Sequence, residues 1–413
     1  MKRSFLFLQG VCSPFFRTLG KALRLDGHAV HKVNFTIGDS VSWLAGGARS
    51  YRSSAEGLPA HYSQLLDRYG VSDVVLFGDC RPIHRPAVEL AKARGIRTHV
   101  FEEGYFRPCW VTLERGGVNA YSSLPRDPQW YRESAKSVPK YGNGDQFFSP
   151  FWVRATHDVL YNFWAGLNPI FYPGYVSHVP YSPAAEYWNY VRRSLKVVRR
   201  QKQDVEKIKE VVGSAANQPY YLLPLQLSSD AQIRHHSQFK DMEEVLERTL
   251  RSFASHAPLD SILVIKNHPL DPGFTDYEAL IDSLAGEFAI KDRVVYLESG
   301  HLPTLLSHTS GVVTVNSTVG GSALVHDCPT IALGRALYDM PGLTFQGELD
   351  DFWRAVEAPN KSLFRDFRNV VIHATQVNGG FYCRRGIDMA VRNAIPVMMA
   401  MESPLEDLMA RHR

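Results

Sequence analysis

Cysteines are few in this sequence, and none lies close to another along the chain. The five are Cys12, Cys80, Cys109, Cys328 and Cys383, and they form no Cys-x-x-Cys pair. Such spacing is not typical of a disulfide framework or of a zinc site. The 16 histidines include no His-Glu-x-x-His motif. The pattern predicts a protein of the reducing cytoplasm that needs no metal.

Long apolar runs and a strong net charge are also missing. No stretch approaches the roughly 18 apolar residues of a transmembrane helix. The run Ser4–Leu8 follows basic residues, as in a signal peptide. It is shorter than the roughly 7–15 apolar residues of a signal core, so we predict a strand there. The formal net charge of +4 over 413 residues indicates no nucleic-acid partner.

Short apolar runs alternate with helical patterns in two parts of the chain, as in parallel sheets covered by helices. The first alternation predicts strands at 4–8, 29–35, 73–77 and 98–102 and helices at 14–24, 60–69 and 86–94. Loops are expected at 119–146, and a helical segment with aromatic and then basic character at 151–212. The second predicts strands at 220–225, 261–266, 294–297, 312–315 and 330–333 and helices at 242–256, 276–285, 302–307 and 318–326, and a further helix is expected at 384–401.

These patterns predict an α/β protein with a GT-B-like architecture, in which two Rossmann-like, doubly wound domains face a central cleft. A chain of this length also favours two domains. We expect the N-terminal domain to span 1–212, including the helical extension at about 151–212. The C-terminal domain is expected at 213–345, followed at 346–413 by helices that pack back across the domains.

Charged residues crowd the end of the predicted strand at 220–225. Gln226, Asp230, Arg234 and His235 follow this strand, and ligands of open α/β sheets bind outside the carboxyl ends of strands. The Asp230 carboxylate is suited to meeting an electrophile or to lying near an anionic ligand. The alternative is that Asp230 caps a helix.

A second polar turn follows the strand that ends at residue 266. Lys266 and His268 supply a point charge and a directional donor, which together suit a phosphate group. The alternative is an ordinary polar loop.

The segment after the strand at 312–315 is rich in small and hydroxyl side chains. Asn316, Ser317, Thr318 and Gly320 lie where this strand meets a helix, and the start of a helix attracts anions. The alternative is helix capping by a hydroxyl and close packing at glycine.

The N-terminal half carries polar groups at four strand ends. Glu102 and Glu103 are adjacent on a strand, so they point to opposite faces, and one can serve as a general acid/base. Arg81 and Arg107 lie near the strand ends and suit a carboxylate ligand. The alternative for Glu102 and Glu103 is an acidic turn.

Aromatic residues between positions 161 and 190 precede a basic stretch that includes Arg192, Arg193 and Arg199. This combination is suited to an anionic membrane surface. The alternative is a packed helix with a solvated basic face.

Taken in order, the motifs resemble those of bacterial capsule polysaccharide β-Kdo transferases of the KpsS/LipB type, a group of capsular polysaccharide biosynthesis and export proteins. Position 109 is a cysteine where aspartate is expected in related chains. The matching pieces are FLFLQG at 5–10, GDCRPIHR at 78–85, EEGYFRP at 102–108, QLSSDAQIRHHS at 226–237, KNHPLD at 266–271 and NSTVGGSAL at 316–324.

The resemblance implies a retaining transferase that moves Kdo from CMP-β-Kdo to a (lyso)phosphatidylglycerol lipid and so starts the poly-Kdo linker of a Gram-negative capsule. The N-terminal domain would bind the acceptor and the C-terminal domain the CMP-sugar. Matching the motifs places the nucleophile on Asp230 and the acid/base on Glu102, with Glu103 as the less favoured choice. No metal or other cofactor is implied.

The resemblance also implies a cytoplasmic enzyme on the inner face of the inner membrane, where other capsule assembly proteins are further partners. Two alternatives stay open: a non-catalytic component of capsule export, and a GT-B enzyme that uses another nucleotide sugar. The implied substrate-binding residues are Gln226, Arg234, His235, Lys266, His268, Asn316, Ser317, Thr318 and Gly320, with Arg81, Arg107 and Arg234 as candidates for the Kdo carboxylate.

Overall fold

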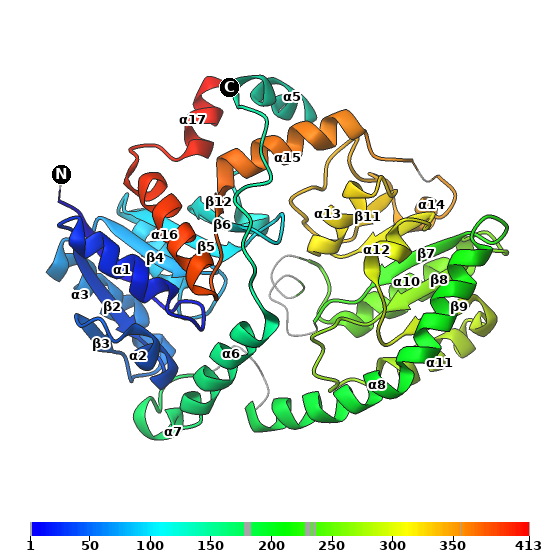
Figure 1. Ribbon diagram of the computed structural model, residues 1–413, viewed down its shortest axis with the longest axis horizontal. Coiled ribbons are helices and arrows are strands. Elements are labelled where there is room, and N and C mark those ends of the chain that lie inside the picture. The colour runs from blue at the N-terminus through cyan, green and yellow to red at the C-terminus, as the bar shows by residue number, and fades with distance from the viewer. Residues whose placement is uncertain (1, 177–182, 228–232, 234–236, 356, 413) are drawn as a thin grey trace. The chain divides into compact units, whose positions relative to one another are not determined.

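Two β-sheets organise the chain in the computed structural model (Figure 1). Each sheet belongs to its own compact unit, and the predicted α/β class with two Rossmann-like domains is confirmed. Unit 1 comprises Met1–Pro125, Glu133–His178 and Arg368–Arg413, and unit 2 comprises Arg126–Arg132 and Val179–Phe367. The structure describes residues 2–176, 183–227, 233, 237–355 and 357–412.

The sheet of unit 1 has seven strands in the order β12-β6-β5-β4-β1-β2-β3. The pairs among β5, β4, β1, β2 and β3 are parallel, whereas β6 pairs antiparallel with β5 and with β12. The strands are β1 (Ser4–Phe7), β2 (Ala29–Asn34), β3 (Ala48–Ser50), β4 (Asp73–Phe77), β5 (Arg97–Glu103), β6 (Trp110–Arg115) and β12 (Gln376–Asn378).

Strands in the middle of this sheet are apolar on both faces because helices cover both. On β1, Phe5 and Phe7 pack with helices α1 and α16, and Leu6 packs on the opposite face with α3 and α4. Because both faces are buried, these strands appear in the sequence as continuous apolar runs. The helices with residues in unit 1 are α1 (Phe15–Leu25), α2 (Ile37–Trp43), α3 (Leu58–Tyr69), α4 (Arg85–Ala93), α5 (Pro128–Ser137), α6 (Phe151–Ala165), α7 (Asn168–Phe171), α15 (Lys361–Thr375), α16 (Arg384–Met399) and α17 (Pro404–Arg411), with short 3-10 turns at Ala55–Gly57 and Asn119–Tyr121.

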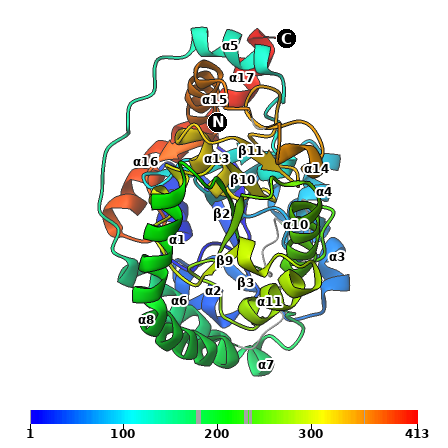
Figure 2. The same cartoon turned by 90° about the vertical axis from the view of Figure 1, so that its right-hand side faces the viewer.

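The sheet of unit 2 has five parallel strands in the order β11-β10-β7-β8-β9. Helix α10 packs on one face of this sheet and α8 on the other (Figure 2). The strands are β7 (Tyr220–Pro224), β8 (Ile262–Lys266), β9 (Val294–Leu297), β10 (Gly311–Thr314) and β11 (Thr330–Ala332). The helices are α8 (Pro183–Ser214), α10 (Met242–His256), α11 (Tyr277–Glu287), α12 (Leu302–Leu306), α13 (Thr318–Val325) and α14 (Leu349–Phe352), with a 3-10 turn at Lys291–Arg293.

Three features of the chain differ from the sequence-based expectations. The predicted N-terminal domain ended at residue 212, but unit 2 begins its main segment at Val179, because α8 bonds to the strand ends of the second sheet. The expected loop region 119–146 contains helix α5. Helices were expected at 346–413, and this segment also supplies β12 to the first sheet.

Candidate functional site

Unit 1 gathers polar side chains from four adjacent strand ends. Strands β5, β4, β1 and β2 are parallel neighbours, so their carboxyl ends share one edge of the sheet. Arg81, after β4, donates from Nη1 to Gln9 Oε1 over 2.8 Å. Gln9, after β1, donates in turn to Asp39 Oδ2 over 3.3 Å. The strand ends therefore form a connected polar edge, as the sequence predicted.

Asp39 fixes the part of this edge that follows β2. It closes a capping box with Thr36 at the start of α2. Its other carboxylate oxygen accepts a 3.1 Å hydrogen bond from the hydroxyl of Tyr161 on α6. A Cβ atom on Gly38 would lie 2.6 Å from the Tyr161 ring, so glycine is needed for α6 to lie this close. The sequence did not single out Asp39 or Tyr161 as partners.

Glu102 is the last but one residue of β5 and lies beside Gly78 and Arg81. A Cβ atom on Gly78 would be 3.3 Å from Glu102 Oε2, and the Glu103 amide donates to Glu102 Oε1 over 3.0 Å. Burial raises the pKa of Glu102 to about 7; the Glu103 amide and Arg81 oppose the shift, and the charge of Glu103 adds to it. A carboxyl group that titrates near neutral pH is suited to general acid/base catalysis.

Glu103 has different partners, on the other face of the strand. Its Oε1 lies 3.4 Å from Arg154 Nη1 and accepts a 3.2 Å hydrogen bond from the Tyr382 hydroxyl. The Arg154 guanidinium lies 4.9 Å from the centre of the Tyr382 ring. Glu103 therefore connects β5 to α6 and to the residue that precedes Cys383, the N-cap of α16.

Arg107 and Cys109 lie in the loop between β5 and β6. Arg107 is exposed and donates from Nε to the Gly104 carbonyl over 3.4 Å. Cys109 is buried, and its carbonyl accepts hydrogen bonds from the Gly379 amide and the Asn378 side chain. Cys109 therefore lies where the start of β6 meets the end of β12, and its backbone helps to hold these two strands together.

Another buried carboxyl group of unit 1, Glu114, was not predicted as part of the site. Glu114, on β6, accepts a 2.7 Å hydrogen bond from the hydroxyl of Tyr105, and the Ser122 hydroxyl donates to its other oxygen. Burial raises the pKa of Glu114 to about 7. Because it is enclosed and hydrogen-bonded, Glu114 fixes the loop that follows β5.

Unit 2 also places polar groups at the carboxyl ends of neighbouring strands. Gln226, after β7, and Asn316, after β10, form a reciprocal pair, with distances of 3.2 Å and 3.3 Å. Lys266 ends β8 and is buried, and its Nζ donates to the Asn267 carbonyl over 3.2 Å. Burial lowers the pKa of Lys266. Three adjacent strands, in the order β10, β7 and β8, thus contribute one side chain each to this edge.

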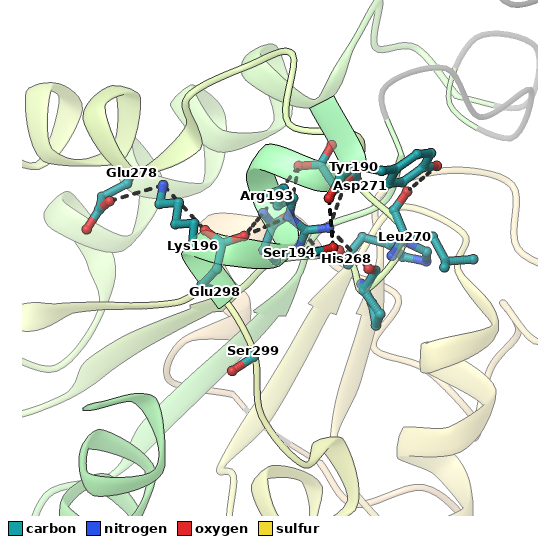
Figure 3. A network of polar contacts seen from close by, with 12 residues as sticks. Tyr190, Arg193, Ser194, Lys196, His268, Leu270, Asp271, Glu278, Glu298 and Ser299 are labelled. Carbon is teal, nitrogen blue, oxygen red and sulfur yellow. Dashed lines mark hydrogen bonds and ion pairs between the residues drawn. The ribbon is translucent and has the colours of Figure 1, made fainter. Parts of the chain in front are cut away.

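Arg193 of α8 holds the turn that contains His268 (Figure 3). Its guanidinium donates to the carbonyls of His268 over 2.8 Å, Pro269 over 3.1 Å and Asp271 over 2.5 Å. Its Nε donates to Glu298 Oε1, after β9, over 2.8 Å. The expectation that Arg193 belongs to a solvated or membrane-facing basic surface is wrong, since its side chain is 8% exposed and fully engaged.

A cavity of about 440 Å³ within unit 2 is lined by Arg193 and by its partners Asp271 and Glu298. Lys196, one turn further along α8, lies 3.5 Å from Glu298 Oε2 and 3.4 Å from Glu278 Oε2. Asn267 donates to both Asp271 and Glu298. Arg193 and Lys196 in the lining of this cavity are therefore already paired with carboxylates.

The start of α13 shows capping and close packing. The Ser317 hydroxyl accepts from the Val319 amide over 3.2 Å, and Thr318 is the first, exposed residue of the helix. A Cβ atom on Gly320 would lie 2.0 Å from the Tyr338 hydroxyl oxygen, whereas one on Gly321 would meet nothing within 4 Å. Gly320 thus has a packing role, and the amide groups at this helix start remain suited to an anion.

Asp230, Arg234 and His235 lie outside the residues that the structure describes. Their assigned roles stay predictions. The flanking residues Gln226 and Ile233 are described, and both are buried.

Comparison with known proteins identifies relatives along nearly the whole chain. The family model described as "Capsule polysaccharide biosynthesis protein" matches residues 72–382. The capsule polysaccharide export protein KpsS of Escherichia coli is 38% identical, with 92% of this chain and 97% of that protein covered. This chain belongs to the capsule polysaccharide biosynthesis family.

Two further comparisons found similar proteins. The capsule polysaccharide modification protein LipB of Neisseria meningitidis serogroup B is 36% identical, with 91% of each chain covered. The solved structure of a Thermosulfurimonas dismutans KpsC β-Kdo 2,7 transferase aligns with 95% of this chain and 99% of its own, at 12% identity and a TM-score of 0.45. The resemblance to the capsule family that was inferred from the sequence motifs is confirmed.

The capsule family match covers most of the candidate residues, including Arg81, Glu102, Lys266 and Asn316. Within the described part of this capsule protein, no helix has the length and apolar character needed to cross a bilayer. Among the same residues, no group of three or more His, Cys, Asp or Glu side chains is arranged to hold a metal ion.

Proposed function

We propose that this capsule family member is a retaining β-Kdo glycosyltransferase. It transfers Kdo from CMP-β-Kdo to a (lyso)phosphatidylglycerol acceptor and thereby starts the poly-Kdo linker of a Gram-negative capsular polysaccharide. The observation that carries the proposal is Glu102, a carboxyl group at a strand end whose pKa is raised to about 7 beside Arg81. Such a group exchanges protons readily at neutral pH.

The choice of Glu102 over Glu103 follows from their partners. Glu103 accepts a hydrogen bond from Tyr382 and is paired with Arg154, so its carboxylate holds α6 and the chain before α16. Glu102 accepts a hydrogen bond from the backbone amide of Glu103 and lies near the positive charge of Arg81. In the proposed reaction Glu102 accepts the proton of the acceptor hydroxyl, and Glu103 positions the elements around it.

The donor phosphate is assigned to the polar edge of unit 2. Lys266 supplies a buried positive charge, and His268 lies on the turn that Arg193 holds. The amides at the start of α13, around Ser317 and Thr318, add an electropositive helix end. Gln226 and Asn316 are assigned to the nucleotide, and Arg234 and His235 keep their assignment to the substrate.

Retention of configuration is most simply explained by double displacement. The Asp230 carboxylate attacks the anomeric carbon of Kdo, and the bond to the CMP phosphate oxygen breaks, so CMP leaves with the electron pair. The acceptor hydroxyl then attacks the same carbon, Glu102 takes its proton, and the bond to Asp230 breaks. Cationic groups stabilise the departing phosphate electrostatically, so the proposal includes no metal. Arg81, Arg107 and Arg234 are the candidates for the Kdo carboxylate.

A lipid acceptor places the proposed enzyme in the cytoplasm, on the inner face of the inner membrane. Its proposed partners are CMP-Kdo, the acceptor lipid and other capsule assembly proteins.

Nucleotide-dependent thermal stabilisation tests the donor. A ligand at about 100 times its Kd stabilises the folded state by roughly 2.7 kcal/mol. We expect CMP to raise the melting temperature and UDP to leave it unchanged. Stabilisation by UDP alone would favour an enzyme that uses another nucleotide sugar.

The nucleophile is tested by Asp230→Ala. We expect this variant to lose transfer while it keeps the wild-type melting temperature and CMP response. Near-normal turnover by Asp230→Ala would remove Asp230 from the proposed mechanism.

A further inference from the structure

Helix α6 has a polar face directed toward the site of unit 1. Arg154 pairs with Glu103, Asp158 lies 3.8 Å from the Cys12 thiol, and Tyr161 donates to Asp39. These three residues recur at intervals of four and three, so they lie on one side of the helix. The inward side of α6 is therefore its polar side.

The opposite side of α6 is apolar and exposed. Trp152, Val159, Leu160 and Phe163 are 77%, 49%, 52% and 67% exposed. Their spacing of seven, eight and eleven residues from Trp152 places them on one helix face. Soluble helices normally bury such a face, so its exposure indicates a partner. We call these four residues the outer face of α6.

Helix α7 continues this exposed surface after a short turn. Ile170 and Phe171 are 73% and 48% exposed. The helix is nevertheless anchored, since Asn168 Oδ1 accepts from the Ile37 amide and the Tyr172 hydroxyl contacts Ser40 and Ser50. Ile170 and Phe171 therefore belong to a helix that hydrogen bonds hold to the rest of unit 1.

Unit 1 carries most of the positive charge of the chain. It contains 25 Lys and Arg and 17 Asp and Glu, a formal net charge of +8, whereas the whole chain carries +4. Unit 2 accordingly carries −4. A positively charged unit with an exposed apolar surface is complementary to an anionic bilayer.

Three arginines on α16 add a local cationic site in unit 1. Arg384, Arg385 and Arg392 line a cavity of about 560 Å³ together with Asp145 and Asp388. None of the three arginines has an ion pair with another residue in the described part of the chain. Such guanidinium groups suit a phosphate headgroup.

The first turn of α16 adjoins the segment that leads into α6. A Cβ atom on Gly386 would lie 2.8 Å from the ring of Phe147. Arg154 of α6 also packs on Tyr382, which lies just before α16. The arginine cluster and the beginning of α6 therefore belong to the same region of unit 1.

We infer that the outer face of α6, together with Ile170 and Phe171 of α7, docks on the surface of a bilayer rich in anionic phospholipid. Trp152 and Phe163 enter the boundary between headgroups and acyl chains, while Arg384 and Arg385 bind phosphate headgroups. The inference rests on the proposed function in one respect, because a lipid acceptor makes a bilayer the fitting partner. Docking would bring the polar face of α6, and Glu102 beyond it, close to the lipid surface.

Cosedimentation of the full chain with vesicles tests this docking surface. The vesicles contain phosphatidylcholine and phosphatidylserine in equal amounts, so the anionic lipid differs from the proposed acceptor. We expect the double variant Trp152→Ser/Phe163→Ser to bind at least tenfold more weakly than wild type. The control Leu25→Ser/Leu259→Ser also removes two exposed apolar side chains, 88% and 85% exposed, and should bind like wild type.

Headgroup binding is tested separately by Arg384→Gln/Arg385→Gln. This variant should lose binding to the mixed vesicles and leave the weak binding to pure phosphatidylcholine unchanged. Equal vesicle binding by wild type and Trp152→Ser/Phe163→Ser, with equal melting temperatures, would overturn the inference. A wild-type dimer that this variant dissociates, without any vesicle binding, would assign the face to a second copy of the chain and would also overturn it.

Transfer to a water-soluble, short-chain acceptor without vesicles separates docking from catalysis. The docking variant should keep wild-type transfer in this assay, because Trp152 and Phe163 lie away from the polar edge. If wild type transfers nothing but binds vesicles through the outer face of α6, the proposed function fails and the docking surface stands.

Discussion

Arg154 of α6 lies 3.4 Å from the Glu103 carboxylate of β5, while the adjacent carboxyl group, Glu102, lies beside Arg81 and Gly78. Glu102 and Glu103, adjacent on β5, therefore have different roles. The pair between Arg154 and Glu103 attaches α6, and burial prepares Glu102 to exchange a proton near neutral pH. The same helix carries the exposed apolar face, so this ion pair connects the proposed membrane surface to the candidate site.

The separation of tasks predicts unequal effects of two matched substitutions. Glu102→Gln removes the proton acceptor and should lower kcat by about 10²–10⁴-fold, the usual contribution of a general acid/base. Glu103→Gln keeps a hydrogen-bond acceptor for Tyr382 and should have a smaller effect. Steady-state transfer assays on both variants measure the difference. A larger loss in Glu103→Gln would reverse the assignment.

The raised pKa of Glu102 predicts the pH dependence of the reaction. Glu102 must be ionised to accept a proton, so kcat/KM should rise as the pH increases through about 7 and then level off. The pH–rate profile of wild type measures this inflection. An unchanged inflection in the residual activity of Glu102→Gln would show that another group is responsible.

Glu114 predicts a pH-dependent change in stability. Its folded-state pKa of about 7 is above its ordinary value of 4.5, so the folded state binds more protons between these limits. The stabilisation is therefore present at low pH and is lost as the pH rises through about 7. Relative to wild type, Glu114→Gln should gain about 1–3 kcal/mol in the free energy of unfolding between about pH 4.5 and 8. Urea unfolding of both proteins at several pH values measures this, and parallel pH curves would contradict it.

Removal of Arg193 should destabilise unit 2. Burial acts to raise the pKa of Glu298, but the hydrogen bond and the charge of Arg193 outweigh it, so the pKa is lowered. Arg193→Ala would leave Glu298 and Asp271 without this cation, at a cost of about 3–5 kcal/mol. Arg192→Ala, at an exposed neighbouring position, should cost little. Chemical unfolding measures the stability of both variants. Equal stability of Arg193→Ala and Arg192→Ala would show that Arg193 does not hold the turn after β8.

Gly320 and Gly321 should respond in opposite ways to alanine. The Cβ atom of Gly320→Ala would overlap the Tyr338 hydroxyl, at a cost of about 1–3 kcal/mol. Gly321→Ala has open space and should stabilise α13 by up to about 1 kcal/mol. Thermal unfolding of the two variants provides the comparison. Equal melting temperatures would mean that Tyr338 moves aside without cost.

The main strands and the polar strand ends could be predicted because each is local in sequence. Apolar runs such as Tyr220–Pro224 are buried on both sides, and the residues that follow them, such as Gln226, lie at one edge of a parallel sheet. Strand β12 could not be predicted, because three residues carry little pattern and their partner, β6, lies more than 260 residues earlier in the chain.

The roles of Arg193 and α6 depend on partners that are distant in the chain. Arg193 lies in a basic helix that looks solvated, and its partner Glu298 is 105 residues away. Likewise, the aromatic residues of α6 indicate a core-facing stripe until Arg154 and Tyr161 are seen to occupy the inward side. In both cases a tertiary contact, and not a local pattern, decides which side chain is buried.

The most direct test of the proposed function is incubation of the purified full chain with CMP-β-Kdo and lysophosphatidylglycerol, followed by mass spectrometry of the lipid. We predict a lipid that carries one added Kdo, with release of CMP. Unmodified lipid beside intact donor, from protein that is folded and binds CMP, would contradict the transferase assignment.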